Sequence, residues 1–161
     1  MLKRGFTIVE LLIVIVVLGV LAAIVTVSYV GISDNAKDAA VQSDLDQSFK
    51  KIEKYEIDNG TLPDTSAAVL PTVLVISKSF YSNSGSGNSY IVCRNDTDIA
   101  ILVRSVTGHT YYISKSRGAG SLHSWPSDTY TTACPAMGIS TSSSGFSYKW
   151  AHANNAWVSY L

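Results

Sequence analysis

One segment of the sequence is so apolar that it limits how the rest of the chain can fold. From Leu11 to Val25 no side chain is polar. The apolar segment extends from Phe6 to Ile32, about 27 residues, which is long enough for a helix to cross a bilayer. The side chains within it that resist lipid are mainly Thr7, Glu10, Thr26 and Ser28. We therefore expect residues 6–32 to form a transmembrane helix.

Basic residues fix the orientation expected for this helix. Lys3 and Arg4 precede it, and cationic residues stay on the cytoplasmic side of a membrane. Residues 1–5 are therefore expected inside the cell and the C-terminus outside. A secretory signal peptide would have a shorter apolar core followed by a small-x-small cleavage site. Leu21-Ala22-Ala23 resembles such a site only loosely, so ordinary signal-peptidase cleavage is the less favoured alternative.

Glu10 is a single carboxylate near the start of an otherwise apolar span. A charge inside a membrane helix costs about 2.5–3.5 kcal/mol on insertion scales. One interpretation is an acid that reaches the membrane interface or is favoured by the helix dipole. The other is an acid that awaits a positive partner, since no Lys, Arg or His lies between residues 5 and 36. Cleavage between Gly5 and Phe6 would create such an amine, one helical turn away.

Residues 3–32 resemble the class III leader and N-terminal helix of type IV prepilins and pseudopilins. The shared features are a basic leader, Gly5, the aromatic Phe6, Glu10 and the apolar span that follows. The resemblance implies that a prepilin peptidase cuts between Gly5 and Phe6 and methylates the new amine of Phe6. It also implies that Glu10 meets the Phe6 amine of an adjacent subunit during assembly.

The resemblance is incomplete at one position. Many members of the family have a proline where Val27 stands, and their helix often loosens between that proline and the glycine that matches Gly19. A proline removes a backbone donor and favours a break, but this chain has no such breaker. We expect either a more continuous helix or opening only around Gly19 and the Thr26–Ser28 segment.

Residues 33–58 change from apolar to amphipathic and continue the same helix. One stripe at three- and four-residue steps is apolar and comprises Ala36, Ala40, Val41, Leu45, Phe49 and Ile52. The opposite face is expected to carry Lys37, Asp38, Asp44, Asp46, Lys50, Lys51, Glu53 and Lys54. Asn59-Gly60 should end a single helix that runs from about Phe6 to Asp58, roughly 80 Å in length.

Beyond the helix the sequence predicts short strands separated by turns. Three runs rich in β-branched and aromatic residues predict an antiparallel meander, namely Ser89–Arg94, Ile99–Val106 and Thr110–Lys115. Phe146–His152 and Ala156–Tyr160 predict a terminal hairpin. Val73–Ser79 is expected to form a peripheral strand, and residues 116–145 are expected to be mostly loop.

Together these expectations describe an α+β chain with the type IV pilin fold. The apolar half of a long N-terminal helix would protrude, and the amphipathic half would pack on a small antiparallel sheet. The expected divisions are a cleaved leader (1–5), a transmembrane or filament-core half (6–32) and a globular head (33–161). The head would contain helix residues 33–58 and a sheet within about 73–160. Cys93 and Cys134 predict one disulfide in an exported chain, and two separate buried thiols are the alternative.

The sequence contains no motif that indicates catalysis or a bound cofactor. His109, His123 and His152 share no metal-ligand spacing, and Asp96 with Asp98 supplies too few oxygens for a calcium site. We expect no enzyme activity, no cofactor and no metal. The 12 basic and 12 acidic residues give a formal charge of zero, so DNA binding is not evident.

Aromatic residues are numerous in the expected head, and the set comprises Tyr111, Tyr112, Trp125, Tyr130, Trp150, Trp157 and Tyr160. About half should belong to the core or to cross-strand pairs. Exposed members could contact sugars, partner cells or neighbouring subunits.

The resemblance implies a structural subunit of an extracellular type IV pilus-like filament that supports adhesion, surface motility or DNA uptake. Its partners would be copies of itself, the prepilin peptidase, an assembly platform in the cytoplasmic membrane and a host-cell or surface receptor. Before assembly it would be a single-pass protein of the cytoplasmic membrane with its N-terminus inside. The alternatives are a minor pseudopilin of a type II secretion or competence machine and, less favoured, a monomeric membrane-anchored binding domain or enzyme.

Overall fold

The computed structural model describes residues 5–66, 68–81, 89–126, 130–145, 147–153 and 156–157. For residues 149–153 and 156–157 it describes the backbone alone. The chain divides into two compact units, Met1–Ala36 and Lys37–Leu161, and each is described by itself.

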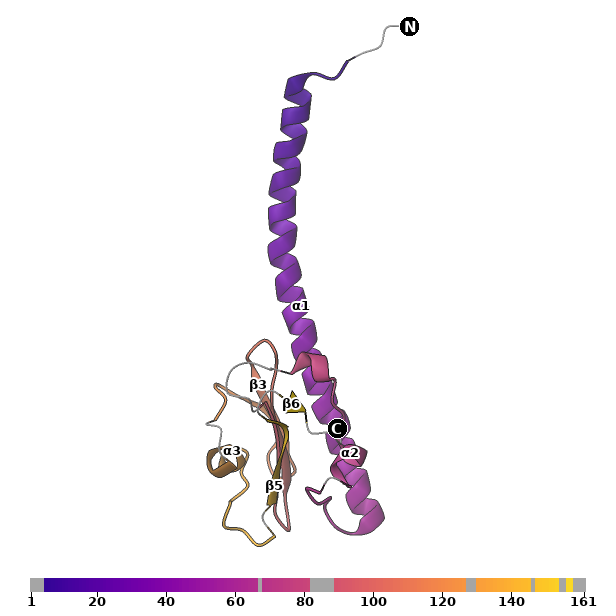
Figure 1. Cartoon of the computed structure of the whole chain (residues 1–161), viewed down its shortest axis with the longest axis vertical. Coiled ribbons are helices and arrows are strands. Elements are labelled where there is room, and N and C mark those ends of the chain that lie inside the picture. The colour runs from indigo at the N-terminus through magenta and orange to yellow at the C-terminus, as the bar shows by residue number, and fades with distance from the viewer. Residues whose placement is uncertain are drawn as a thin grey trace. The chain divides into compact units, whose positions relative to one another are not determined.

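One helix, α1 (Ile8–Asn59), forms most of the first unit and continues into the second (Figure 1). Its apolar part consists of Leu, Ile, Val and Ala with Gly19 inside it, and no proline removes a backbone donor. The helix therefore continues through Val27 without a break. It ends where Gly60 adopts φ 72° and its N–H donates to the Glu56 carbonyl at 2.8 Å. Glycine adopts this left-handed conformation readily, so it ends the helix. The predicted single long helix is confirmed.

The second half of α1 buries one stripe of side chains. Val41, Leu45 and Ile52 are buried, as the helical periodicity predicts. Ala36, which was expected on the same stripe, is exposed.

Two acidic residues of α1 depart from the predicted pattern. Asp38 and Asp44 were expected on the solvent-facing side of the helix, and both are buried. The prediction was wrong because helical periodicity treats every carboxylate as a group that needs water. A buried carboxylate is stable where hydrogen-bond donors replace that water, and here the donors come from distant parts of the chain.

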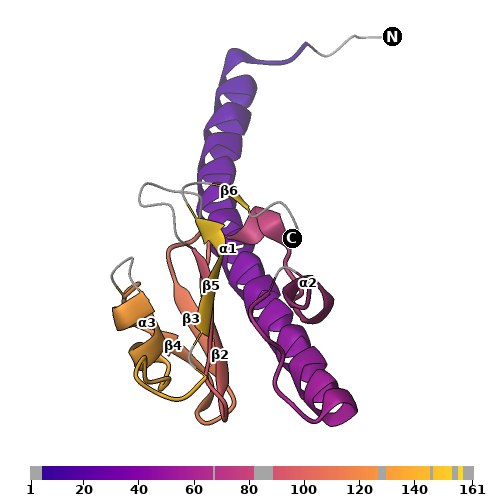
Figure 2. The same ribbon diagram turned by 60° about the horizontal axis from the view of Figure 1, so that its bottom comes forward.

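Six antiparallel strands form one sheet in the order β4-β3-β2-β1-β5-β6 (Figure 2). The strands are β1 (Tyr90–Arg94), β2 (Ile99–Arg104), β3 (Thr110–Ser114), β4 (Gly118–Leu122), β5 (Ser147–Ala153) and β6 (Ala156–Trp157). The predicted meander corresponds to β1–β3, and the predicted terminal hairpin corresponds to β5 and β6. The antiparallel sheet and the α+β class are therefore confirmed. The sequence did not predict that β5 pairs with β1, which places the terminal hairpin at the edge of the sheet opposite to β4.

The expected strand at Val73–Ser79 is wrong. This stretch contains the end of α2 (Leu70–Val73) and the start of the short 3₁₀ helix η1 (Lys78–Phe80). Between them, the backbone N–H groups of Val75 and Ser77 donate to side chains of α1 rather than to a neighbouring strand. This apolar, β-branched run therefore forms no strand, because its backbone N–H groups bond to side chains of a helix instead of to another strand.

Residues 116–145 also contain more regular structure than expected. They include β4 and the helix α3 (Tyr130–Ala136). The β4 sequence Gly-Ala-Gly-Ser-Leu has a low strand propensity, but its ladder to β3 satisfies the backbone groups. Pairing with an existing strand outweighs local preference in this case.

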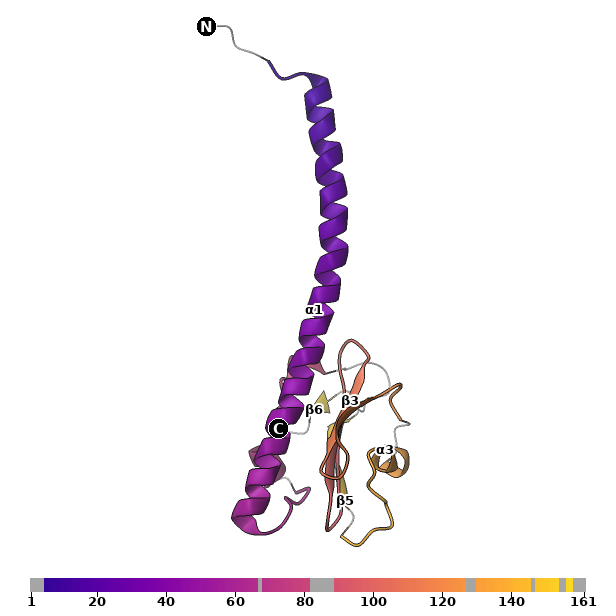
Figure 3. The ribbon, with the colours of Figure 1, turned by 180° about the vertical axis from the view of Figure 1, so that it is seen from behind.

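Both faces of the sheet are covered within the second unit. On one face, Tyr90, Val92 and Ile101 pack with the buried stripe of α1. On the other face, Ile91 and Cys93 pack with residues of α3. Figure 3 shows α3 and α1 on opposite sides of the sheet. The central strands are therefore buried on both faces, which explains why they read as continuous apolar runs rather than as an alternating pattern.

A disulfide joins Cys93 of β1 to Cys134 of α3, with a Cα–Cα distance of 5.7 Å. Both cysteines are fully buried in the cluster on the α3 face of the sheet. The alternative of two separate buried thiols is therefore excluded. The bridge attaches α3 covalently to the central strand.

Candidate assembly segment

The first unit presents an uninterrupted apolar surface. Every large apolar side chain from Phe6 to Ile32 is at least 50% exposed. By length and composition, α1 is long and apolar enough to cross a membrane. Soluble monomers rarely expose apolar patches of more than a few hundred Å², so this surface requires lipid or another protein to cover it.

Thr7 and Glu10 cap the first turn of α1 reciprocally. Glu10 Oε2 accepts hydrogen bonds from the backbone N–H of Thr7 at 3.0 Å and from its hydroxyl at 2.8 Å. In return, Thr7 Oγ1 accepts the backbone N–H of Glu10 at 3.2 Å. This is a capping box, which satisfies two backbone donors that the helix would otherwise leave unpaired. The Thr-x-x-Glu spacing is its signature, and our sequence analysis overlooked that signal.

Gly5 and Phe6 lie immediately before the helix. Both residues are exposed and neither belongs to a regular element, because α1 begins at Ile8. The peptide bond between them is therefore outside the helical hydrogen-bond ladder.

The polar residues in the middle of the apolar segment bond to their own helix. Thr26 Oγ1 donates to the Ala22 carbonyl at 2.8 Å, and Ser28 Oγ donates to the Ile24 carbonyl at 3.1 Å. Such bonds to the preceding turn satisfy hydroxyl groups without water. Gly19 has open space around its Cα, so nothing within the subunit requires a glycine there.

Asp44 connects α1 to the segment that follows α2. Its carboxylate accepts hydrogen bonds from the Ser77 backbone N–H at 2.6 Å and from the Tyr81 hydroxyl at 2.8 Å. One turn further along α1, Ser48 Oγ accepts the Val75 N–H at 2.8 Å. Burial, together with Tyr90 and Asp44 nearby, raises the pKa of Tyr81, so its hydroxyl remains a donor.

Asp38 connects α1 to the turn between β2 and β3. Thr107 Oγ1 donates to Asp38 Oδ1 at 2.6 Å, and His109 Nδ1 lies 2.5 Å from Asp38 Oδ2. Burial would raise the pKa of Asp38, but hydrogen bonds from Ser105, Thr107 and His109 together lower it. Asp38 therefore holds the β2–β3 turn against the helix as a carboxylate.

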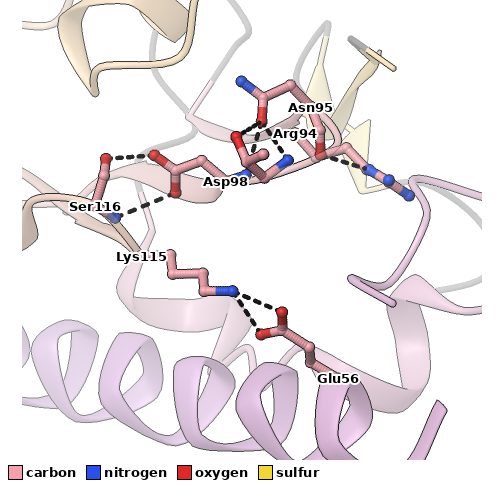
Figure 4. A network of polar contacts seen from close by, with 7 residues as sticks. Glu56, Arg94, Asn95, Asp98, Lys115 and Ser116 are labelled. Carbon is pink, nitrogen blue, oxygen red and sulfur yellow. Dashed lines mark hydrogen bonds and ion pairs between the residues drawn. The ribbon is translucent and has the colours of Figure 1, made fainter. Parts of the chain in front are cut away.

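A third connection joins α1 to the turn between β3 and β4 (Figure 4). Lys115 Nζ donates to both carboxylate oxygens of Glu56, at 2.6 and 2.9 Å. The neighbouring Ser116 donates to Asp98 through its hydroxyl, and its backbone N–H does so at 3.3 Å. Together with Asp38 and Asp44, this ion pair attaches α1 to the head at three places along the helix.

Two residues considered as possible metal ligands, Asp98 and His109, have other partners in the structure. Within the described residues, no group of three or more His, Cys, Asp or Glu side chains could hold a metal ion. Asn95 Oδ1 accepts the N–H groups of Thr97 and Asp98 at 2.9 and 2.7 Å, which closes the β1–β2 turn. His109 pairs with Asp38, as described above. Trp150, Trp157 and Tyr160 lie outside the residues whose side chains are described.

These features define a class of protein. Its long helix begins with a capped apolar part that is long enough to cross a membrane, and it continues into a head with an antiparallel sheet and a disulfide. The family model described as the prokaryotic N-terminal methylation motif matches residues 1–26. The chain is similar to the type IV wide pilus major component PilA4 of Thermus thermophilus. The two are 34% identical over 90 residues, which cover 54% of this chain and 69% of that protein.

A second set of relatives belongs to type II secretion systems. The chain is 40% identical over 63 residues to the type II secretion system core protein G of Klebsiella pneumoniae, covering 39% of this chain and 45% of that protein. It is 34% identical over 63 residues to core protein G of Pseudomonas aeruginosa, covering 39% and 44% respectively. The chain thus spans less than half the length of these proteins. Taken with the PilA4 match, the chain belongs to the type IV pilin family.

Proposed function

We propose that this protein is a structural subunit of an extracellular type IV pilus-like filament, polymerised through residues 6–32. The observation that carries the proposal is the long apolar surface of the first unit, which none of its described side chains covers. A helix of this kind is stable in lipid or against sister helices. The similarity to PilA4 over 69% of that protein's length favours the filament. The role is structural rather than enzymatic.

The proposal includes a processing step before assembly. The precursor stands in the cytoplasmic membrane with residues 1–5 inside and residues 33–161 outside. A prepilin peptidase cuts the Gly5–Phe6 bond and methylates the amine of Phe6. An assembly platform in the same membrane then transfers the subunit into the filament, where a cell-surface receptor or another solid surface becomes its partner.

Assembly replaces a lipid environment by a protein environment of similar polarity. Apolar burial is nearly conserved in this exchange, so close helix packing and polar pairing must favour the filament. Gly19 allows a close approach because it has no side chain and open space around it. Gly19 also serves as a flexible point of the helix.

Glu10 changes partner in this scheme. In the separate subunit its carboxylate is occupied by Thr7. In the filament its carboxylate accepts a hydrogen bond from the Phe6 amine of an adjacent subunit. An unpaired charge inside a helical bundle is strongly destabilising, whereas a paired charge adds little net stability. Glu10 therefore acts mainly on register and recruitment.

The second candidate is a pseudopilin of a type II secretion or competence machine. The identity to core protein G of Klebsiella pneumoniae favours it. Such a subunit shares the N-terminal processing but does not form the bulk of a surface fibre. The two candidates therefore differ in the abundance of the subunit outside the cell.

One experiment tests both the processing and the filament. Surface fibres are sheared from cells, and the mass of the N-terminal peptide is measured alongside subunit abundance. We expect a chain that begins with methylated Phe6 and is the main protein of the fibre. A processed chain absent from sheared fibres favours the pseudopilin. An uncut chain found only in the membrane contradicts both.

A further inference from the structure

A groove separates α1 from the outer strand of the sheet in the second unit. Its main hollow has a volume of about 420 Å³ and lies between Gln42, Leu45 and Asp46 of α1 and residues of β3 and β4. Beside it lies a second hollow of about 280 Å³, lined by residues from His109 to His123. Because Tyr111 and Ser121 line both hollows, they adjoin each other. We call the two together the α1–β4 groove.

The groove exists because β4 presents small side chains toward α1. In the β3–β4 register, Ile113 pairs with Ala119 and Tyr111 pairs with Ser121. Ile113 and Tyr111 pack in the core beneath α1, so Ala119 and Ser121 lie on that same face of the sheet. Large residues at these two positions would close the gap.

Tyr111 forms a fixed aromatic platform in this groove. Its ring packs against the buried core beneath α1. The ring of His109 meets it edge-on, with centroids 6.4 Å apart. A ring that is held on two sides loses little conformational freedom when a ligand packs on it.

A second aromatic residue is positioned by a glycine. A Cβ at Gly120 would lie 2.7 Å from the ring of its cross-strand partner Tyr112, so the ring lies directly over the bare backbone. An aromatic ring that covers a glycine on the adjacent strand stabilises an edge strand. Tyr112 packs with the cluster on the α3 face of the sheet, so this pair stabilises β4 from behind the groove.

The lining determines which ligand fits. The main hollow offers an amide in Gln42, a carboxylate in Asp46 and a hydroxyl in Ser121, next to aromatic and small apolar surface. Among the described residues that line the main hollow, none is Lys, Arg or His, so an anion there would meet only a carboxylate. His109 and His123 line the adjoining hollow. A purely apolar ligand would leave the polar groups without partners. The ligand should therefore be uncharged, with many hydroxyls and flat apolar faces.

We propose that the α1–β4 groove binds a short uncharged oligosaccharide. Sugar rings combine C–H faces that pack on aromatic rings with hydroxyls that both donate to and accept from amides and carboxylates. The main hollow has the volume of a small-ligand site, and the adjoining hollow provides room for a further ring. The strand β4 lies at the outer edge of the sheet, where a chain-like ligand can enter from one side (Figure 2).

Titration calorimetry on the detergent-solubilised full chain tests this site. The probes are uncharged hexasaccharides of glucose, N-acetylglucosamine, mannose and xylose, with an oligogalacturonate as the anionic comparison. We expect at least one uncharged probe to bind and the oligogalacturonate to bind more weakly. Because no filament is needed, a failure here leaves the assembly proposal untouched.

Two variants fill the groove without removing a polar contact of the core. Ala119→Leu occupies the main hollow, and Ser121→Leu occupies the part that both hollows share. The matched control is Ala39→Leu, at an exposed position of α1 that does not line the groove. We expect each filling variant to weaken binding about tenfold or more and the control to change it less than twofold. Near-ultraviolet circular dichroism verifies that each variant is folded.

Three results would overturn the proposal. The first is that no uncharged probe binds. The second is that a folded Ala119→Leu or Ser121→Leu variant binds as tightly as the unmodified chain. The third is that the oligogalacturonate binds more tightly than every uncharged probe.

Discussion

Glu10 and Thr7 satisfy each other at the start of α1 through three hydrogen bonds of 2.8–3.2 Å. The acid that the family resemblance assigns to subunit contacts therefore has a partner within its own chain. A carboxylate that caps its helix is held in a defined position before a second subunit arrives. Capping and intersubunit pairing are separate properties of one side chain, and substitutions can separate them.

Glu10→Gln should separate the two properties. Glutamine can still complete a capping box, but it cannot neutralise an amine. Leaving the buried Phe6 amine unpaired would cost about 3 kcal/mol for each contact, which should reduce sheared filaments more than tenfold. Immunoblots of membrane and sheared fractions measure insertion and assembly separately. We expect normal insertion, and normal filament yield would refute the pairing role.

Thr7→Val provides the matched control for this experiment. It removes the capping hydroxyl and should destabilise the first turn of α1 by about 1 kcal/mol, while the charge of Glu10 remains. We expect filament yield close to that of the unmodified chain. A loss as large as that of Glu10→Gln would mean that capping, rather than charge, matters for assembly.

Asp44→Ala should destabilise the head strongly. The change removes the acceptor of the half-buried Ser77 N–H and of the buried Tyr81 hydroxyl, which costs about 2–4 kcal/mol in free energy of unfolding. Denaturant unfolding of the solubilised full chain, followed by tyrosine fluorescence, measures this difference. Asp46→Ala, an exposed acid two positions along the same helix, should change stability by less than about 0.5 kcal/mol. Equal effects would show that Asp44 is not a special anchor.

Asp38 should make the head sensitive to acid. Its pKa is lowered in the folded state, so its contribution is fully present above the ordinary aspartate pKa of about 3.9. The contribution is lost as the pH falls below that value and through the lower folded pKa. Unfolding free energies of the unmodified chain and Asp38→Asn, measured from about pH 6 down to pH 2, should therefore converge at the acid end. A difference that is constant with pH would contradict this account.

Removing the disulfide should weaken the attachment of α3. The bridge joins residues separated by 41 positions, and a loop of this length corresponds to about 4 kcal/mol in the chain-entropy model. The double variant Cys93→Ala with Cys134→Ala should lower the denaturant midpoint accordingly. Reductant should lower the midpoint of the unmodified chain but leave that of the double variant unchanged. Insensitivity of both to reductant would show that the bridge adds no stability.

The sequence alone determined the long helix and the strands of the meander. An apolar run without proline, together with an amphipathic stripe, has few folded solutions besides one long helix. Runs rich in β-branched and aromatic residues, and the turn residues between them, are equally local, so β1, β2 and β3 were predictable within a few residues. The Thr-x-x-Glu cap was available from the sequence too, since its two members lie only three positions apart.

Tertiary structure decided the features that depend on distant partners. Asp38 and Asp44 read as solvent-facing acids, and they are buried because donors about 30 to 70 positions away replace water. Val73–Ser79 reads as a strand, but its backbone bonds to α1. β4 has a poor strand sequence and forms because β3 offers an unpaired edge. In each case a hydrogen bond to another element outweighs the preference of the segment itself, and the segment's own pattern does not contain that information.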